Sequence, residues 1–333
     1  MSPTPSRRDA LRAFAAQQLG DDQVQPQPAS ADASFRGYWR VHSAGRSYVL
    51  MDAPPDKEDI APWLDVGRRL RVAGLNAPKV LATDLDAGFV LMDDMGERQY
   101  LPELNAHTVD ALYADALGAL LRMQVGVDTD GLPDYDHRRL VDEMELMPTW
   151  FVQRHLGIKP ECEDWDVIES MFGTLTRSAL LQPRRFVHRD FHSRNLMLVP
   201  GANPGIIDFQ DAVRGPLTYD LVSLLRDCYI AWPREQVLDW AESHRLHLRA
   251  AGATDADAAT WKRWFDLMGM QRHLKVLGIF CRLCYRDGKA GYLNDLPLVL
   301  RYTLDVADEY AEMHEFGDWL RRVVGARDLT IAA

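Results

Sequence analysis

Residues 186–211 form an extended, polar interruption in a part of the chain that is otherwise helical in pattern. They read FVHRDFHSRNLMLVPGANPGIIDFQD, with a short apolar run on each side of a turn rich in proline and glycine. Such runs flanking such a turn predict a β-hairpin. Because functional side chains concentrate on loops that a rigid scaffold holds, this segment is where we expect the chemistry of the protein.

The predicted hairpin gives a meaning to the spacing of three polar residues. Asn195 enters the first strand and Asp208 leaves the second, so their side chains are expected to lie side by side. Amide and carboxylate oxygens are hard ligands suited to Mg²⁺. Asp190 precedes the hairpin, where it can receive the proton of a substrate hydroxyl. Metal ligands plus such a carboxylate are the parts that phosphoryl transfer needs.

The rest of the sequence predicts an α+β protein of two unequal lobes, 1–95 and 96–333. The smaller lobe is expected to be an antiparallel sheet with one helix, preceded by a short helix and an exposed loop over 21–30. The larger lobe shows the apolar spacing of helices. The expected strands are 38–42, 47–51, 79–85 and 89–92, and the expected helices are 10–19, 59–73, 108–123, 140–156, 165–181, 219–231, 234–251, 260–286 and 298–324.

Composition excludes some classes of protein. The formal net charge of -11 disfavours nucleic acid as the main partner, because phosphate binding needs a basic face. No stretch approaches the roughly 20 apolar residues of a membrane helix. Ser6-Arg7-Arg8 is superficially like an export signal, but Asp9 and Arg12 interrupt the apolar segment that should follow. We therefore expect a cytoplasmic protein with no membrane partner.

The polar segment resembles the catalytic and metal-binding loops of eukaryotic-like kinases, in His188-Arg189-Asp190, in Asn195 and in Asp208-Phe209-Gln210. His192 and the segment 215–220 are closer to the aminoglycoside phosphotransferase branch. The resemblance implies a protein-kinase-like two-lobe fold that uses ATP and Mg²⁺, with Asp190 as the catalytic residue and Asn195 and Asp208 as metal ligands. It also implies that His188 and Asp220 have a structural part near the site. The residues it implies for nucleotide binding are Ser34, Phe35, Arg36 and Arg40 near the first strands, and Met92, Asp93 and Met95 at the hinge between the lobes.

One position departs from the kinase pattern. Kinases of this superfamily carry a lysine on the third strand that pairs with the nucleotide phosphates, and Met51 stands there in this chain. The first lysine is Lys57. Arg36, Arg40 or Lys57 is therefore expected to supply the charge, or else the protein does not turn over ATP.

A narrower resemblance extends over nearly the whole chain and includes the methionine at position 51. The segments 48–55, 143–157, 271–280 and 286–289 are similar to those of the anomeric N-acetylmuramate/N-acetylglucosamine kinases of bacterial cell-wall recycling. This resemblance implies transfer of the γ-phosphoryl group of ATP to the anomeric hydroxyl of an amino sugar. The residues we expect to contact the sugar are Glu143, Glu145, Trp150, His192, Arg226, Arg272, His273 and Lys275.

Two other functions stay open at this point. An aminoglycoside kinase would need an acidic wall for its cationic substrate, and the basic stretch 272–286 argues against it. A pseudokinase that binds without catalysis is favoured by Met51, whereas the complete set of Asp190, Asn195 and Asp208 argues against it. The sequence leaves open the oligomeric state and the preference between the two sugars.

Overall fold

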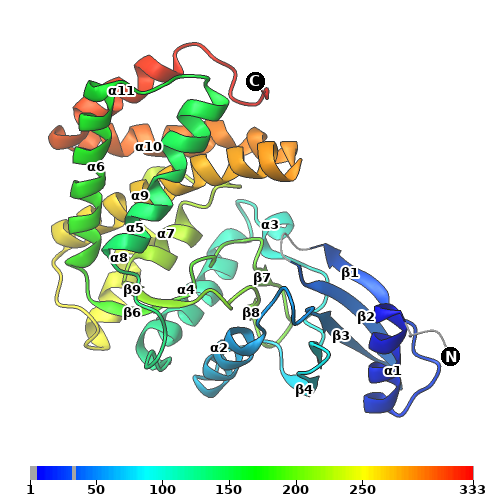
Figure 1. The fold of residues 1–333 in the computed structure, drawn as a ribbon. Helices are drawn as coiled ribbons and strands as arrows, with labels where there is room; N and C mark the ends of the chain where they lie inside the picture. Colours follow the sequence, from blue (N-terminus) through cyan, green and yellow to red (C-terminus); the bar gives the residue numbers. More distant parts are fainter. Residues whose placement is uncertain (1–5, 32–34, 333) are drawn as a thin grey trace. The chain divides into compact units, whose positions relative to one another are not determined.

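The computed structural model describes residues 6–31 and 35–332 and divides the chain into two compact units (Figure 1). Unit 1 consists of residues 1–116 and 195–211, and unit 2 of residues 117–194 and 212–333. The two lobes predicted from the sequence, with a boundary near residue 95, are defined by function and not by compactness. That boundary stays a prediction. The predicted α+β class is confirmed, because a five-stranded sheet accompanies a mostly helical remainder.

The sheet of unit 1 is antiparallel and has the strand order β1-β2-β3-β5-β4. All four expected strands are confirmed. The expectation of an exposed loop over 21–30 is wrong in part, because β1 pairs with β2 at the edge of the sheet, where Pro28 is tolerated. The elements are α1 Arg7–Leu19, β1 Gln27–Ala31, β2 Gly37–Ser43, β3 Arg46–Asp52, α2 Ala61–Val72, β4 Val80–Asp84 and β5 Phe89–Asp93.

Side chains alternate between the two faces of this sheet, so the two faces have different surroundings. On one face, Val41 and Leu50 pack with Leu11 and Phe14 of α1, which a Ser6–Asp9 capping box begins. Arg40, Val49 and Met92 point to the other face, because they alternate with those buried residues along their strands. One face therefore builds a core and leaves the other available for a site.

The predicted hairpin is confirmed as β7 Leu196–Met197 and β8 Gly205–Ile206, and it belongs to unit 1. Two backbone bonds tie it to the first hundred residues. The Leu198 amide donates to the Arg98 carbonyl at 2.7 Å, and the Ile206 amide donates to the Asn76 carbonyl at 2.8 Å. Unit 1 also contains α3 Tyr100–Glu103 and the start of α4 Val109–Gly126.

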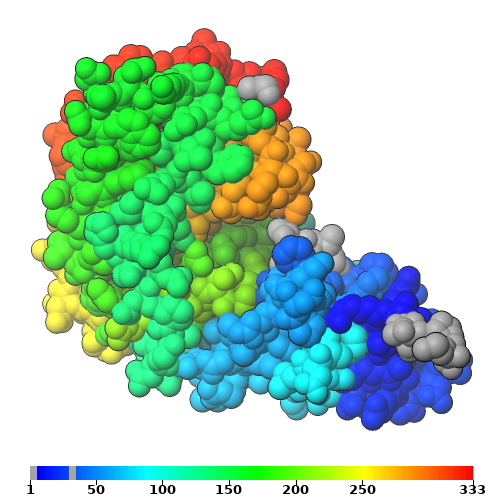
Figure 2. Space-filling view, viewed as in Figure 1, coloured from blue at the N-terminus to red at the C-terminus, as the bar shows by residue number. Residues whose placement is uncertain are grey.

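Unit 2 is built around α9, a helix of 30 residues that most other helices of the unit contact. Figure 2 shows a continuous surface where α6 (green) meets the C-terminal helices (red). A two-stranded sheet of β6 and β9 completes the unit. Its elements are α5 His137–Met144, η1 Met147–His155, α6 Cys162–Leu180, β6 Arg184–Val187, β9 Val213–Pro216, α7 Tyr219–Leu225, α8 Arg234–Ala250, α9 Ala258–Asp287, η2 Ala290–Asp295, α10 Leu296–Glu309, η3 Ala311–Met313 and α11 His314–Val324.

Three predicted helices are shorter or broken. The helix expected over 140–156 is α5 followed by a π-helix whose first turn contains Pro148, which lacks an amide hydrogen. The helix expected over 298–324 breaks at Tyr310, whose backbone is extended and whose hydroxyl donates to buried Asp266 at 2.9 Å. The helix expected over 219–231 ends at Leu225.

Across the described ranges, 6–31 and 35–332, we find no helix with the length and apolar character needed to cross a bilayer.

Candidate active site

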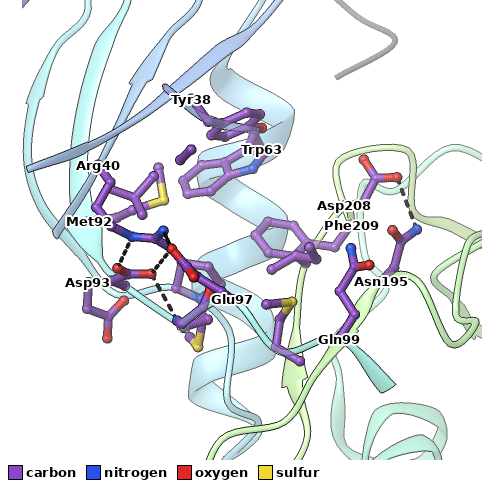
Figure 3. Close-up of a pocket in the computed structure, with 18 residues that line it drawn as sticks. Tyr38, Arg40, Trp63, Met92, Asp93, Glu97, Gln99, Asn195, Asp208 and Phe209 are labelled. Atoms are coloured by element: carbon purple, nitrogen blue, oxygen red, sulfur yellow. Dashed lines mark hydrogen bonds and ion pairs between the residues drawn. The ribbon is translucent and has the colours of Figure 1, made fainter. Parts of the chain in front are cut away.

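A cavity of about 390 Å³ opens within unit 1 between the second face of the sheet and the hairpin (Figure 3). The strands contribute an apolar wall, the segment after β5 contributes acidic and backbone groups, and the hairpin contributes Asn195 and Asp208. The lining residues are Ala29, Tyr38, Arg40, Val49, Trp63, Pro78, Met92, Asp93, Asp94, Met95, Gly96, Glu97, Gln99, Asn195, Met197, Ile207, Asp208 and Phe209.

Phe209 anchors the end of the hairpin to α2. Its ring centroid lies 5.2 Å from that of Trp63 (Figure 3). A Cβ atom at Gly67 would lie 3.1 Å from the Phe209 ring, so the glycine lets the ring lie close against the helix. This packing holds the neighbouring Asp208 at the wall of the cavity.

Asn195 and Asp208 lie side by side, as the hairpin predicts. The Asn195 Nδ2 donates to Asp208 Oδ2 at 3.1 Å, and Gln210 Nε2 donates to Asp208 Oδ1 at 3.0 Å. Asp208 has a φ of 63°, a left-handed conformation that costs free energy in a residue with a side chain. Backbone strain of this kind concentrates at functional sites, and it turns the carboxylate toward its amide neighbour.

This pair fits a Mg²⁺ ion. Both side chains offer hard oxygen donors, both line a cavity, and no apolar side chain separates them, because they share a direct hydrogen bond. Their role as metal ligands stays a prediction.

Arg40 is held beside the segment that follows β5. Its Nε donates to Asp94 Oδ2 at 2.6 Å and its Nη2 to Asp94 Oδ1 at 3.1 Å, and it also pairs with Glu97. Burial would raise the pKa of Asp94, but the hydrogen bonds from Arg40 and Ser47 outweigh burial and lower it. Two carboxylates therefore already balance the charge of this arginine.

The other predicted nucleotide residues are distributed unevenly. Met92, Asp93 and Met95 line the cavity together with Arg40. Phe35 is outside the lining, with its ring exposed and the Lys57 ammonium 5.2 Å from the ring centroid. Ser34 lies outside the described residues, and Arg36 follows Phe35 but is likewise absent from the lining. Nucleotide binding by all of them stays a prediction.

Asp190 lies in unit 2, on a loop that Asp220 braces. The two carboxylate oxygens of Asp220 accept hydrogen bonds from the His188 amide at 2.7 Å and the Arg189 amide at 3.0 Å. Arg189 has a φ of 79°, so the loop turns sharply just before Asp190. These bonds are what the predicted structural role of Asp220 and His188 requires.

The surroundings of Asp190 keep it ionised. Burial would raise its pKa, but the positive charges of Lys275, Arg189 and Arg272, with the His192 imidazole, outweigh burial and hold the pKa below its ordinary value. The carboxylate can therefore accept a proton at neutral pH.

Glu143 and Lys275, two residues predicted to bind the sugar, bind each other. The Lys275 Nζ lies 3.1 Å from a Glu143 carboxylate oxygen and donates to the Tyr219 hydroxyl at 3.1 Å. Glu143 also pairs with Arg189 and accepts a hydrogen bond from the Tyr135 hydroxyl. The cluster thus contacts the catalytic loop through Arg189, and contact of its members with a substrate stays a prediction.

The remaining predicted sugar contacts are mostly in the helical core of unit 2. Arg272 is buried and donates to the Cys228 sulfur at 3.1 Å. Arg226 pairs with buried Asp266 at 3.7 Å, and the His273 Nε2 bonds to the Arg226 carbonyl oxygen at 3.1 Å. Trp150 is partly buried against the core, whereas Glu145 is exposed. Their contact with a substrate stays a prediction that no observed contact supports.

Sequence reasoning missed an aromatic group beside the catalytic loop. The ring centroids of Tyr229 and Phe280 lie 6.0 Å apart, and those of Phe280 and Tyr292 lie 5.2 Å apart. The predicted residue His192 meets Tyr229 edge-on at 5.6 Å, and the Arg194 guanidinium lies over the Tyr229 ring at 3.5 Å. The three rings come from three separate segments, so no spacing pattern predicts their contact, although Arg194 directly precedes Asn195.

Residues 26–261 match the phosphotransferase enzyme family, and the chain therefore belongs to that family. The chain is 45% identical over 297 residues to an N-acetylmuramate/N-acetylglucosamine kinase of Pseudomonas aeruginosa, with 88% of this chain and 87% of that protein covered. It is 43% identical over 309 residues to a kinase of the same name from Neisseria meningitidis, with 90% and 91% covered. The predicted relationship and the prediction of a phosphotransferase are confirmed.

Solved structures agree on the fold. A Plasmodium vivax ethanolamine kinase superposes with a TM-score of 0.62 at 11% identity, covering 89% of this chain and 87% of that one. An ADP-bound aminoglycoside phosphotransferase superposes with a TM-score of 0.58 at 15% identity, covering 89% and 98%. At these identities the likeness concerns the fold alone, and it confirms the predicted protein-kinase-like fold.

Proposed function

We propose that this protein is an ATP-dependent kinase that phosphorylates the anomeric hydroxyl of N-acetylmuramate or N-acetylglucosamine to the sugar 1-phosphate, as a step in the reuse of cell-wall sugars. The observation that carries the proposal is 42–45% identity over about nine tenths of the chain to kinases named for these two sugars. The reaction needs ATP, so we place the protein in the cytoplasm.

The cavity of unit 1 is the site we assign to the nucleotide. Its size falls within the range of small-molecule sites. Met92 and Val49 offer an apolar surface for a base, and the segment 93–97 offers backbone groups for hydrogen bonds. Asn195 and Asp208 stand where the phosphates need a metal, and a bound Mg²⁺ would neutralise developing charge on the transferred phosphoryl group.

Asp190 is the residue we assign to the sugar hydroxyl. Its lowered pKa means that the carboxylate is present to accept the hydroxyl proton at neutral pH. An anomeric hydroxyl is more acidic than an ordinary alcohol, so a weak base is enough. Most of the rate enhancement would then come from holding the two reactants in position, which is also what the Asp220 brace of the loop supports.

Met51 affects how the phosphate charge is balanced. Its side chain is fully buried and carries no charge, and Arg40 is already paired with Asp94 and Glu97. More of the phosphate charge therefore falls on the metal site than in a kinase with a strand lysine. We expect a steep dependence of activity on the Mg²⁺ concentration.

One assay separates the possible functions. The protein is incubated with Mg·ATP and N-acetylmuramate, N-acetylglucosamine or kanamycin, and ADP and products are followed by mass spectrometry and phosphorus NMR. A sugar 1-phosphate supports the proposal. Phosphorylated kanamycin would assign an aminoglycoside kinase, and nucleotide binding without ADP would assign a pseudokinase.

A further inference from the structure

Arg194 is a cation beside the catalytic loop whose charge no carboxylate of the protein balances at close range. Its guanidinium carbon lies 3.5 Å from the centroid of the Tyr229 ring and 5.9 Å from that of Tyr292. In the part of the chain that the structure describes, no carboxylate lies within 4.0 Å of its nitrogens and it makes no hydrogen bond. A half-buried guanidinium that has no anionic partner in the protein can bind an anionic group of a ligand through charge-assisted hydrogen bonds.

Two carboxyl groups of this region, those of Asp227 and Asp295, are committed elsewhere or are poor partners. Asp227 accepts hydrogen bonds from the amide of Ser193 at 3.0 Å and from its hydroxyl, and from the Tyr229 amide at 3.2 Å. Burial raises the pKa of Asp295, although the charge of Arg194 acts in the opposite direction. The arginine is therefore held in place by an aromatic face and not by an ion pair.

Three other cations of this region already have protein partners. Arg272 donates to Cys228, Lys275 pairs with Glu143, and Arg226 pairs with Asp266. All three are buried. Arg282 of α9 is also partly buried, with an Nε that has no hydrogen-bond partner among the described residues, but Arg194 is the cation that lies both on the loop of Asp190 and over the Tyr229 ring. An anionic substituent that approaches this loop would therefore meet Arg194.

Arg194 is also close to the reacting end of the substrate. It follows Asp190 by four residues, and His192, between them, feels the charges of both. The His192 ring contacts the edge of the same Tyr229 whose face carries Arg194. A sugar whose anomeric hydroxyl reaches Asp190 can therefore extend toward the aromatic group of Tyr229, Phe280 and Tyr292 and the guanidinium on it.

We propose that Arg194 binds the lactyl carboxylate of N-acetylmuramate and so sets the preference between the two sugars, an inference that rests on the proposed function. A guanidinium stacked through one face keeps its edge N–H groups for a planar carboxylate, in a geometry that lysine cannot reproduce. N-acetylglucosamine lacks the lactyl group, so it gains nothing from this contact.

The test compares both sugars in the full-length enzyme. Arg194→Gln should raise the KM for N-acetylmuramate by about 10- to 100-fold, the loss of a charge-assisted hydrogen-bonded pair, and should leave kcat and KM for N-acetylglucosamine within about twofold. Arg194→Lys should recover part of the loss. Arg301→Gln is the matched control, because Arg301 also lies near a tyrosine ring, that of Tyr302 at 6.0 Å, but on the exposed side of α10.

A substrate-side measurement completes the test. The amide of N-acetylmuramate has no carboxylate. For the unaltered enzyme, its KM should be raised as much as the KM for N-acetylmuramate is raised in Arg194→Gln. The Arg194→Gln variant should have the same KM for the acid and for its amide. Equal losses with both sugars, or a raised KM for ATP, would assign Arg194 to the phosphates and overturn the inference. If the unaltered enzyme turns over N-acetylglucosamine and N-acetylmuramate but does not prefer the acid to its amide, the inference fails while the proposed function stands.

Discussion

Asp190 is a carboxylate whose charge is maintained by neighbours that are themselves buried. Lys275 and Arg189 lie in one ion cluster with Glu143, and their charges lower the pKa of Asp190 against the effect of burial. The same cluster contacts the loop that carries Asp190. The charge and the position of this carboxylate are thus set by the same few side chains.

Replacement of Asp190 by asparagine should lower kcat by about 10²- to 10⁴-fold, as expected for loss of a general base. ATP binding should be nearly unchanged, because the nucleotide cavity of unit 1 does not include this residue. Steady-state kinetics give the first quantity, and calorimetry with Mg·ATP gives the second. Unchanged turnover would remove Asp190 from its proposed role.

Replacement of Asp208 by asparagine should act on the nucleotide side. The change removes the negative charge of the proposed metal pair while keeping its size, so the Mg²⁺ concentration for half-maximal activity should rise about tenfold or more. Titration of activity with MgCl₂ at saturating sugar measures it. Glu97→Gln removes one negative charge from the Arg40 side of the same cavity and serves as the charge control, and an equal shift in that variant would contradict a specific metal site.

How much of the site could be predicted depends on how far apart the interacting residues are in the sequence. Asn195 and Asp208 are thirteen residues apart and joined by a hairpin, so their contact follows from local turn chemistry. Glu143 and Lys275 lie on different helices, α5 and α9, and nothing in their sequence surroundings indicates that they pair. The two were predicted as sugar contacts because a carboxylate can accept hydrogen bonds from sugar hydroxyls and an ammonium can bind a substrate carboxylate, and only tertiary packing reveals that they neutralise each other.

At the level of elements, the contact between α9 and the π-helix η1 depends on one missing side chain. A Cβ atom on Gly278 would lie 2.2 Å from the Leu146 carbonyl carbon, in contact with backbone that cannot move aside cheaply. Apolar periodicity predicts that 140–156 and 260–286 are helical, but it cannot predict how closely the two segments approach. For the same reason it does not predict the π-helical turns or the break at Tyr310.

Gly278→Ala should therefore lower the free energy of unfolding by about 3 kcal/mol or more, because overpacking against backbone is relieved only by moving a helix. Chemical denaturation followed by circular dichroism measures this change. Gly173→Ala in α6 is the matched control. A Cβ there meets nothing within 4 Å, so the gain in helix propensity should stabilise the protein by about 0.5–1 kcal/mol. Equal effects of the two substitutions would contradict the close approach.

For the whole molecule, the buried Glu143 links stability to pH. Burial would raise its pKa, but Lys275 and Arg189 outweigh burial and lower it below the ordinary value of 4.5. A carboxyl with a lowered pKa in the folded state contributes stability that is complete above its unfolded pKa and is lost as the pH falls through its folded pKa. The contribution is therefore present at neutral pH and disappears on acidification.

Glu143→Gln should lower the free energy of unfolding by about 3–5 kcal/mol at pH 7, because it leaves buried Lys275 and partly buried Arg189 without their carboxylate. The difference from the unaltered protein should shrink as the pH falls below 4.5. Denaturation at a series of pH values measures it. Glu169→Gln, at an exposed position of α6, should stay within about 0.5 kcal/mol at every pH. A Glu143→Gln difference that does not vary with pH would contradict the charge argument.

The backbone bonds between the hairpin and Arg98 and Asn76 limit how this chain can be recombined. In a chimera that takes only residues 1–95 from a relative, the foreign sheet would pack against the original hairpin. The ring of Phe209 would then meet the α2 helix of the relative, which fits the hairpin of that relative. Workable exchange of the nucleotide half needs two crossover segments, the first hundred residues and 195–211 together. We therefore expect the two stretches to function together only when both come from the same parent, although 94 residues separate them.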